Sequence, residues 1–151
     1  MLANGTKLEY KKKSGGSYTV LTKLKEIPEI GDEPEKVENT CLSDPVKMYE
    51  YGIGDPGELE FKFIYDNSSE SSSYRILRKA AEEKEVLLFK ETLVDGTAFE
   101  WEAQVSVKLG GGGVNGAIEF TCKMALQSKI SVTDPSWKKV KKKKSRKIEE
   151  D

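Results

Sequence analysis

The side chains in this sequence that could carry acid–base chemistry are mostly carboxylates, because the chain has 26 Asp and Glu residues and no histidine. The absence of histidine removes the most common general base, the usual catalytic triads and every histidine-based zinc site. Two cysteines, Cys41 and Cys122, are too few for a cysteine-only zinc site. No HExxH, GxSxG or EF-hand motif occurs, and no GxGxxG motif leads into a helix. We therefore expect neither an enzyme nor a metal or cofactor site.

Three carboxylates, Glu100, Glu102 and Glu119, stand out because they occupy the polar positions of predicted strands. Such positions face solvent in a half-buried sheet. We expect these carboxylates to be solvated, although carboxylates are too numerous for the sequence alone to exclude a catalytic pair elsewhere.

Basic residues are concentrated in a C-terminal tail, 136–151, where eight Lys and Arg face three Asp and Glu. The rest of the chain carries the other 17 of 25 Lys and Arg against 23 of 26 Asp and Glu, a net charge of -6. A basic run can bind nucleic acid through counterion release, but like-charge blocks of this length are usually flexible tails. The chain's own acidic body is an equally suitable partner. The basic residues of the tail are Lys138, Lys139, Lys141, Lys142, Lys143, Lys144, Arg146 and Lys147.

Apolar and polar residues alternate along most of the chain, which is typical of half-buried strands. An Asp95-Gly96 pair between two such runs predicts a hairpin with a type I′ turn, and Gly15-Gly16 predicts another hairpin. Gly-rich residues 109–117 are predicted to form a flexible turn. The predicted strands are 6–11, 18–24, 37–42, 59–65, 86–94, 97–107 and 118–126.

One amphipathic helix is predicted over 69–84, because Tyr74, Leu77 and Ala81 share one helical face. Serines at 68–73 offer hydroxyls for its N-cap. We expect the helix to cover one end or one face of the sheet.

A long loop is predicted over 43–57, where Gly and Pro residues interrupt any strand but apolar and aromatic residues are present. These side chains need a surface to cover, which could belong to their own domain or to a neighbouring subunit. The two cysteines are interpreted as small buried hydrophobic residues.

The length of 151 residues and the hydrophobic fraction of 36% suit one domain. We predict a mainly β domain over 1–135, a small antiparallel β-sandwich or barrel with one flanking helix. No run of about 18 apolar residues exists, so no membrane insertion is expected. The first residues lack an apolar segment, so we expect no secretion signal and synthesis in the cytoplasm.

Five segments follow one another in a specific order, although each is weak alone: Gly5–Tyr10, Leu24–Gly31, Glu33–Thr40, Gly52–Gly57 and Glu58–Asp66. This order of features resembles the major tail tube protein of phages with long, non-contractile tails. The resemblance extends to about Pro135 and leaves out the basic tail.

The resemblance implies a structural virion protein of a phage or a prophage, assembled in the bacterial cytoplasm. Such proteins form hexameric rings that stack into a hollow tube through which DNA is ejected, and they share their fold with contractile injection machines. Implied partners are further copies of the chain and the tape measure, tail initiator and tail terminator proteins.

Two groups of site residues follow from the resemblance. The long loop is expected to contact other subunits through Met48, Tyr49, Tyr51, Ile53 and Asp55. The polar sheet face is expected to line the lumen, where carboxylates would repel DNA phosphates. The candidate lumen residues are Glu100, Glu102, Gln104 and Glu119.

Two other functions remain open from the sequence. An immunoglobulin-like binding or adhesion module would need a secretion signal and would be a stable monomer. A nucleic-acid-binding β-barrel that uses the lysine-rich tail would need a basic and aromatic sheet face, whereas the exposed side of the clearest predicted strand is acidic.

Overall fold

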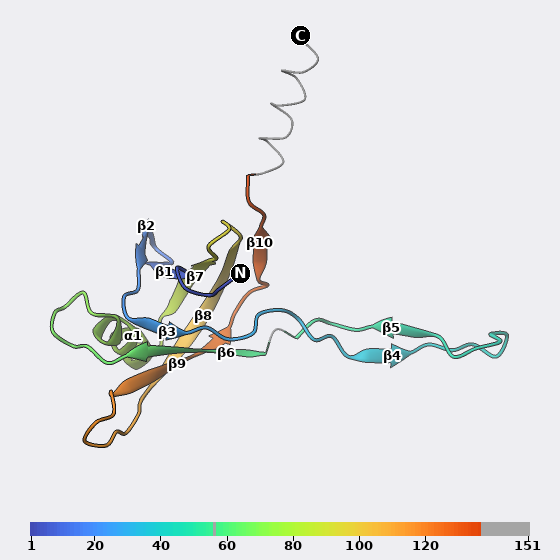
Figure 1. Cartoon of the computed structure of the whole chain (residues 1–151). Coiled ribbons are helices and arrows are strands. Elements are labelled where there is room, and N and C mark those ends of the chain that lie inside the picture. The colour runs from blue at the N-terminus through green and yellow to red at the C-terminus, as the bar shows by residue number, and fades with distance from the viewer. Residues whose placement is uncertain (56, 137–151) are drawn as a thin grey trace, which may run out of the picture.

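Eleven elements form a curved antiparallel sheet, one helix and a separate two-stranded arm (Figure 1). The computed structural model describes residues 1–55 and 57–136. The sheet has the strand order β2-β1-β7-β8-β9-β6-β3, with β10 paired to β8, and the arm consists of β4 and β5. The bounds are β1 Lys7–Lys12, β2 Gly15–Val20, β3 Leu24–Glu26, β4 Lys36–Glu38, β5 Tyr49–Tyr51, β6 Glu58–Ile64, α1 Ser73–Glu82, β7 Val86–Thr92, β8 Ala98–Leu109, β9 Glu119–Leu126 and β10 Ser131–Thr133.

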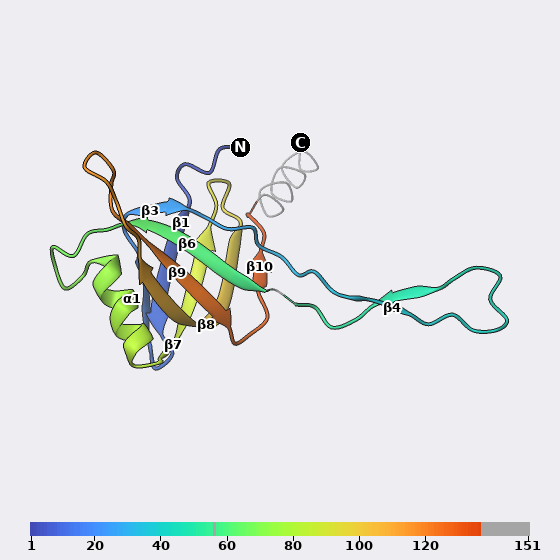
Figure 2. The same ribbon diagram turned by 90° about the horizontal axis from the view of Figure 1, so that it is seen from below.

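The two edges of the sheet are brought towards each other by a very short connection. Strands β2 and β3 lie at opposite ends of the strand order, yet only residues 21–23 separate them in the chain. The Leu21 N–H donates to the Leu8 carbonyl of β1 at 2.8 Å, and the Ile64 N–H of β6 donates to the Lys23 carbonyl at 2.9 Å. The sheet therefore curves strongly without forming a closed barrel (Figure 2). The prediction of a mainly β fold with one flanking helix is confirmed.

The apolar side of the alternating strands forms the core, because successive side chains point to opposite faces of a strand. Trp101 lies between Phe61 and Phe89, with ring centroids 6.0 and 6.1 Å away. Phe63 stacks on Phe120 at 4.9 Å. These five aromatic side chains are each at most 2% exposed.

Helix α1 covers this core and lies within the predicted range 69–84. It buries Leu77 and Ala80, and the Tyr74 ring packs edge-on against Phe120 at 5.3 Å. Its N-cap residue, Ser72, makes no side-chain capping bond. The hydroxyl of Ser73 instead donates to the Thr22 carbonyl at 2.7 Å. A serine predicted to cap the helix therefore fastens it to the connection between β2 and β3.

The two predicted hairpins form, but the turn between β7 and β8 differs from the prediction. The type I′ turn is wrong: Gly96 has a positive φ of 97° and Asp95 does not. The Leu93 carbonyl accepts from the Gly96 N–H, and the Leu93 N–H donates to the Thr97 carbonyl, so Gly96 occupies the bulge position of a longer turn. The Asp95 carboxylate accepts from the Thr97 N–H at 3.0 Å, which lowers the pKa of Asp95.

Three short strands, β3, β5 and β10, were not predicted. Each has three residues, so none is long enough to show an alternating pattern. The sequence predicted a strand over 18–24, whereas β2 covers 15–20. Lys23, in the connection that follows β2, has a left-handed φ of 68°. No helix of the described chain is long and apolar enough to span a membrane.

Candidate functional site

Residues 43–55 of the predicted loop form the return side of a β-hairpin arm and contain one short strand, β5. We define the arm as residues 33–55. Strand β5 within it pairs with β4, and Lys36 lies opposite Tyr51. The pairing continues towards the root, where the Gly52 N–H donates to the Glu35 carbonyl at 2.7 Å. Both views show the arm extending away from the sheet on the side opposite α1 (Figures 1 and 2).

The tip of the arm is held by its own hydrogen bonds. The Met48 N–H donates to the Thr40 hydroxyl at 2.9 Å, and the Asn39 N–H donates to the Met48 carbonyl at 3.0 Å. Beyond them, the Cys41 N–H donates to the Asp44 carboxylate at 2.7 Å. The interpretation of both cysteines as buried is therefore wrong for Cys41, which is exposed here, and confirmed for Cys122, which lies in the core. Cys41 lies on the arm, where strands β4 and β5 bury neither face.

Apolar side chains are exposed along the whole arm. Met48, Tyr49, Tyr51 and Ile53 are 46%, 50%, 71% and 95% exposed. They are absent from the core cluster and from the partly buried residues that pack against it, so the arm does not cover its own domain. Several large apolar side chains exposed on one segment usually mark an interaction site.

The two faces of the arm differ in character. Tyr49 and Tyr51 lie opposite Glu38 and Lys36 on one face, and the Lys36 Nζ is 5.4 Å from the Tyr49 ring centroid. The other face carries Val37 opposite Glu50, so the aromatic surface is one-sided.

Asp55, predicted with the contact residues, lies apart from them at the root of the arm. Its carboxylate accepts from the Gly57 N–H at 2.9 Å, where Gly57 has a positive φ of 71°. Its carbonyl accepts from the Glu33 N–H at 3.1 Å. Asp55 therefore shapes the turn by which the arm rejoins β6.

The four candidate lumen residues lie on one surface, the polar face of the sheet opposite the core. Glu100, Glu102 and Gln104 alternate on β8 with the inward-facing Trp101 and Ala103. Glu119 occupies the same face of β9, because the next residue, Phe120, is buried. The structure thus places all four residues on one face, although Glu119 lies beside Gly110, beyond the far end of β8 from Glu100.

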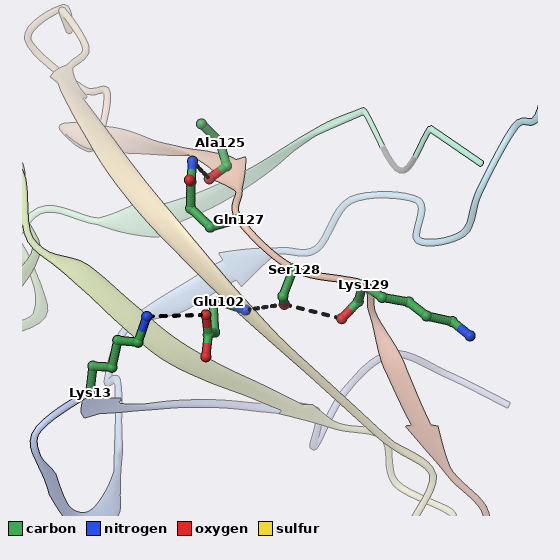
Figure 3. Close-up of polar contacts among 6 residues, drawn as sticks. All are labelled: Lys13, Glu102, Ala125, Gln127, Ser128 and Lys129. Carbon is green, nitrogen blue, oxygen red and sulfur yellow. Dashed lines mark hydrogen bonds and ion pairs between the residues drawn. The ribbon is translucent and has the colours of Figure 1, made fainter. Parts of the chain in front are cut away.

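Lysines compensate these carboxylates, so the polar face is not the acidic surface that was expected. Lys13 Nζ lies 3.7 Å from Glu102 Oε2 (Figure 3), and Lys25 forms an ion pair with Glu119. Glu100 lies directly opposite Lys90 in the register of β7 and β8. The Glu119 carboxylate raises the pKa of Lys25 by hydrogen bonding and charge. Exposed pairs of this type add little stability, but they neutralise the surface.

A polar chain of contacts fixes the end of β9 beside this face. The Glu102 N–H donates to the Ser128 hydroxyl at 2.9 Å, and that hydroxyl donates to the Lys129 carbonyl at 3.1 Å (Figure 3). The Gln104 side-chain amide donates to the Lys84 carbonyl at 3.3 Å. Backbone contacts therefore hold the carboxylate-bearing strand in a fixed position.

One ionisable group that the sequence reasoning missed is Glu91, which is 2% exposed. It lies on the core side of β7, opposite Leu8 of β1 and Phe99 of β8. Its Oε1 has no hydrogen-bond partner within the described chain, and burial raises the pKa of Glu91 to about 7. Its parity with Leu87 and Phe89 would have revealed its inward position.

The described residues contain no cluster of three or more His, Cys, Asp and Glu suited to a metal ion. The basic residues predicted in the tail, Lys138 to Lys147, lie outside the described residues. The described side chains offer an exposed apolar arm, of the kind that marks interaction surfaces, and a charge-compensated sheet face.

Comparisons with known proteins identify this architecture. Residues 1–121 match the family described as phage tail tube, TTP, lambda-like. A comparison with curated proteins finds no match.

Solved structures of tail and injection particles share the fold. A chain of the anti-feeding prophage baseplate, 6-fold symmetrised, has a TM-score of 0.70 at 12% identity, covering 89% of this chain and 95% of that chain. A chain from the tail of an empty gene transfer agent particle, refined with C6 symmetry, has a TM-score of 0.67 at 18% identity, covering 86% and 98%. A chain of an extracellular contractile injection system has a TM-score of 0.62 at 7% identity, covering 88% and 96%.

These likenesses establish the fold, and the family match covers most of the sequence. The chain belongs to the lambda-like phage tail tube protein family and is a structural component of a virion tail.

Proposed function

We propose that the chain forms hexameric rings that stack into the wall of a tail tube through which DNA is ejected. The observation that carries this proposal is the arm, which exposes Met48, Tyr49, Tyr51 and Ile53 to solvent in the isolated chain. The symmetry of the two similar particles, 6-fold and C6, supports six subunits per ring.

The arm needs a neighbouring subunit for energetic reasons. A two-stranded hairpin alone is marginally stable in water, and β4 and β5 have only three residues each. Burying one large apolar side chain contributes roughly 1.5–3 kcal/mol. Two or three such side chains per arm, repeated in every subunit, would stabilise contacts within or between rings. Head-to-tail contacts that close by rotation form rings, and axial contacts that do not close form filaments.

The polar face of the sheet is our candidate for the lumen wall, and Glu100, Glu102, Gln104 and Glu119 are its central residues. The ion pairs to Lys13 and Lys25 change the expected electrostatics from repulsion to near-neutrality. A surface with little net charge neither holds DNA phosphates nor repels them over a distance. This balance suits a conduit, and it favours the tube over a nucleic-acid-binding barrel, which would present a basic surface.

Further partners of the tube belong to the same proposal. A tail initiator would nucleate the first ring, a tape measure protein would occupy the lumen during growth, and a terminator would cap the last ring. If the exposed apolar residues of the arm make contacts between rings, the terminal rings would offer that surface to such caps.

Electron microscopy of concentrated protein, with and without a tail initiator complex, tests the proposal. We expect rods or rings in at least one condition. The variant Tyr49→Ser/Tyr51→Ser/Ile53→Ser should abolish them while its far-ultraviolet circular dichroism stays that of the wild type. A matched control, Val94→Ser/Val114→Ser, removes exposed apolar side chains outside the arm and should still assemble.

Two results would contradict the proposal. Dispersed particles under both conditions would count against a tube subunit. Normal tubes from the triple variant would show that the arm is not the assembly surface.

A further inference from the structure

An acidic groove lies where the arm joins the sheet. It has a volume of about 640 Å³. Its polar lining consists of six carboxylates without any lysine or arginine, and Pro28 and Ile30 add apolar surface. The six acidic residues are Glu29, Asp32, Glu33, Asp55, Glu58 and Glu60. We call this surface the root groove.

Close contacts hold the two chain segments of the root groove next to each other. Gly54 lies so near Asp32 that a Cβ on the glycine would be 2.8 Å from the Asp32 carboxylate oxygen. The Glu33 N–H bonds to the Asp55 carbonyl, and the Asp55 carboxylate holds Gly57. Its acidic side chains are therefore presented together on one surface.

The root groove has almost no cation of its own among the described residues. Within that part of the chain, Glu60 pairs with Lys123 at 3.3 Å, and the other five carboxylates of the groove form no ion pair. This contrasts with the polar sheet face, where lysines compensate Glu102 and Glu119. Uncompensated carboxylates in a concave surface raise the local concentration of cationic ligands.

The chain carries a matching cationic segment, 137–147, with eight Lys and Arg and no acidic residue. Trp137, Val140 and the methylene chains of its lysines could cover the apolar surface beside the carboxylates. The segment starts directly after Ser136, the last described residue.

The described chain passes beside the groove shortly before this segment begins. Ile130 and Val132, just before and within β10, line a small pocket together with Ile30, Gly31 and Asp32 of the groove. From there only four residues lead to Ser136. Eleven further residues can span about 35 Å when extended, and a tethered ligand has an effective concentration in the millimolar range. These features favour the groove of the same chain over that of another copy.

We propose that the root groove binds the lysine-rich segment 137–147 of its own chain. The bound segment neutralises the groove and lies across the root of the arm. The proposal concerns the free subunit, so it holds or fails independently of tube formation.

Zero-length carbodiimide cross-linking of the full-length protein tests this proposal, because the reagent joins a lysine to a carboxylate only where they touch. Equal amounts of unlabelled and ¹⁵N-labelled chains are mixed at low concentration, cross-linked, digested and analysed by mass spectrometry. We expect products that join Lys138–Lys147 to Glu29, Asp32, Glu33, Asp55 or Glu58, each of a single isotopic type. Their yield should fall at least fivefold in 1 M salt, where the screening length is about 3 Å.

Two matched variants locate the contact. Asp32→Asn/Glu33→Gln/Asp55→Asn/Glu58→Gln should lower the yield at least fivefold, and Asn at 55 keeps the oxygen that accepts from Gly57. The control removes the same number of charges elsewhere on the surface and should leave the yield unchanged. Its changes are Glu38→Gln, Glu50→Gln, Glu82→Gln and Glu83→Gln.

Three outcomes would overturn the proposal. Products spread over exposed carboxylates in proportion to their number would show a non-specific tail. Isotopically mixed products in statistical amounts would assign the groove to a second copy. Equal cross-linking yields from the two variants would show that the segment does not bind at the root groove. If the groove variant does not fold, the wild-type map and its salt dependence decide the matter.

Discussion

Replacing Glu91 with glutamine should change how the stability of the fold depends on pH. Glu91 is buried between Leu8 and Phe99, its Oε1 has no partner within the described chain, and burial raises its pKa from 4.5 to about 7. The folded protein therefore keeps this proton up to about pH 7, whereas the unfolded chain loses it near pH 4.5. The stabilisation is complete below pH 4.5 and is lost as the pH rises towards 7.

The size of the effect follows from the shift of the pKa. One pKa unit corresponds to 1.36 kcal/mol, so the shift from 4.5 to about 7 gives about 3 kcal/mol. Because the side chain is 2% exposed, solvent screening does not reduce this value much. Glutamine has the same shape without the titrating proton. The Glu91→Gln variant should be more stable than the wild type at pH 8, and the difference should shrink towards pH 4.5.

Urea unfolding followed by tryptophan fluorescence at half-unit steps from pH 4.5 to 8 measures this difference, since Trp101 is buried in the core. Groups that titrate identically in both proteins cancel. The control Glu102→Gln alters a partly exposed carboxylate paired with Lys13 and should change stability by less than about 1 kcal/mol. Parallel stability curves for Glu91→Gln and the wild type would refute the reasoning.

Three further predictions concern the core, the cysteines and the turns. Phe61→Ala should destabilise the fold by about 3–5 kcal/mol, because the ring is fully buried against Trp101. The loss should appear as a lower urea midpoint. A change below about 1 kcal/mol would contradict the buried position of this ring in the core. Cys41 should react with a thiol reagent in the native monomer while Cys122 reacts only on unfolding, since burial raises the pKa of Cys122 to about 12; equal native rates would show that the core opens. Lys23→Gly should stabilise the fold by up to about 1 kcal/mol, because Lys23 has a left-handed φ of 68°. A loss of stability in thermal unfolding would show that the Lys23 side chain stabilises the fold by more than its backbone conformation costs.

The arm shows why part of the site escaped prediction. Its Gly and Pro residues break the pattern on which strand assignment depends, and both of its faces are exposed. A strand that buries neither face leaves no alternation in the sequence. The apolar residues of the segment were therefore visible as unusual, but their pairing with 36–38 was not.

The polar sheet face shows the complementary case. Parity along one strand placed Glu100, Glu102 and Gln104 on the same surface, since the side-chain period of a strand is a local property. The charge of that surface depended on Lys13 and Lys25, which reach it from distant parts of the chain. A local pattern cannot predict such neighbours.

The sequence by itself determined the β class, the single helix, the buried side of each long strand and the lack of catalytic motifs, because these depend on residue type and spacing over a few positions. Only the tertiary structure decided that the sheet curves until its edges approach, that residues 33–55 form an arm standing clear of the domain, and that the Oε1 of the inward-facing Glu91 has no hydrogen-bond partner within the described chain. Those features arise from contacts between segments far apart in the chain, whose energies depend on three-dimensional neighbours rather than on sequence order.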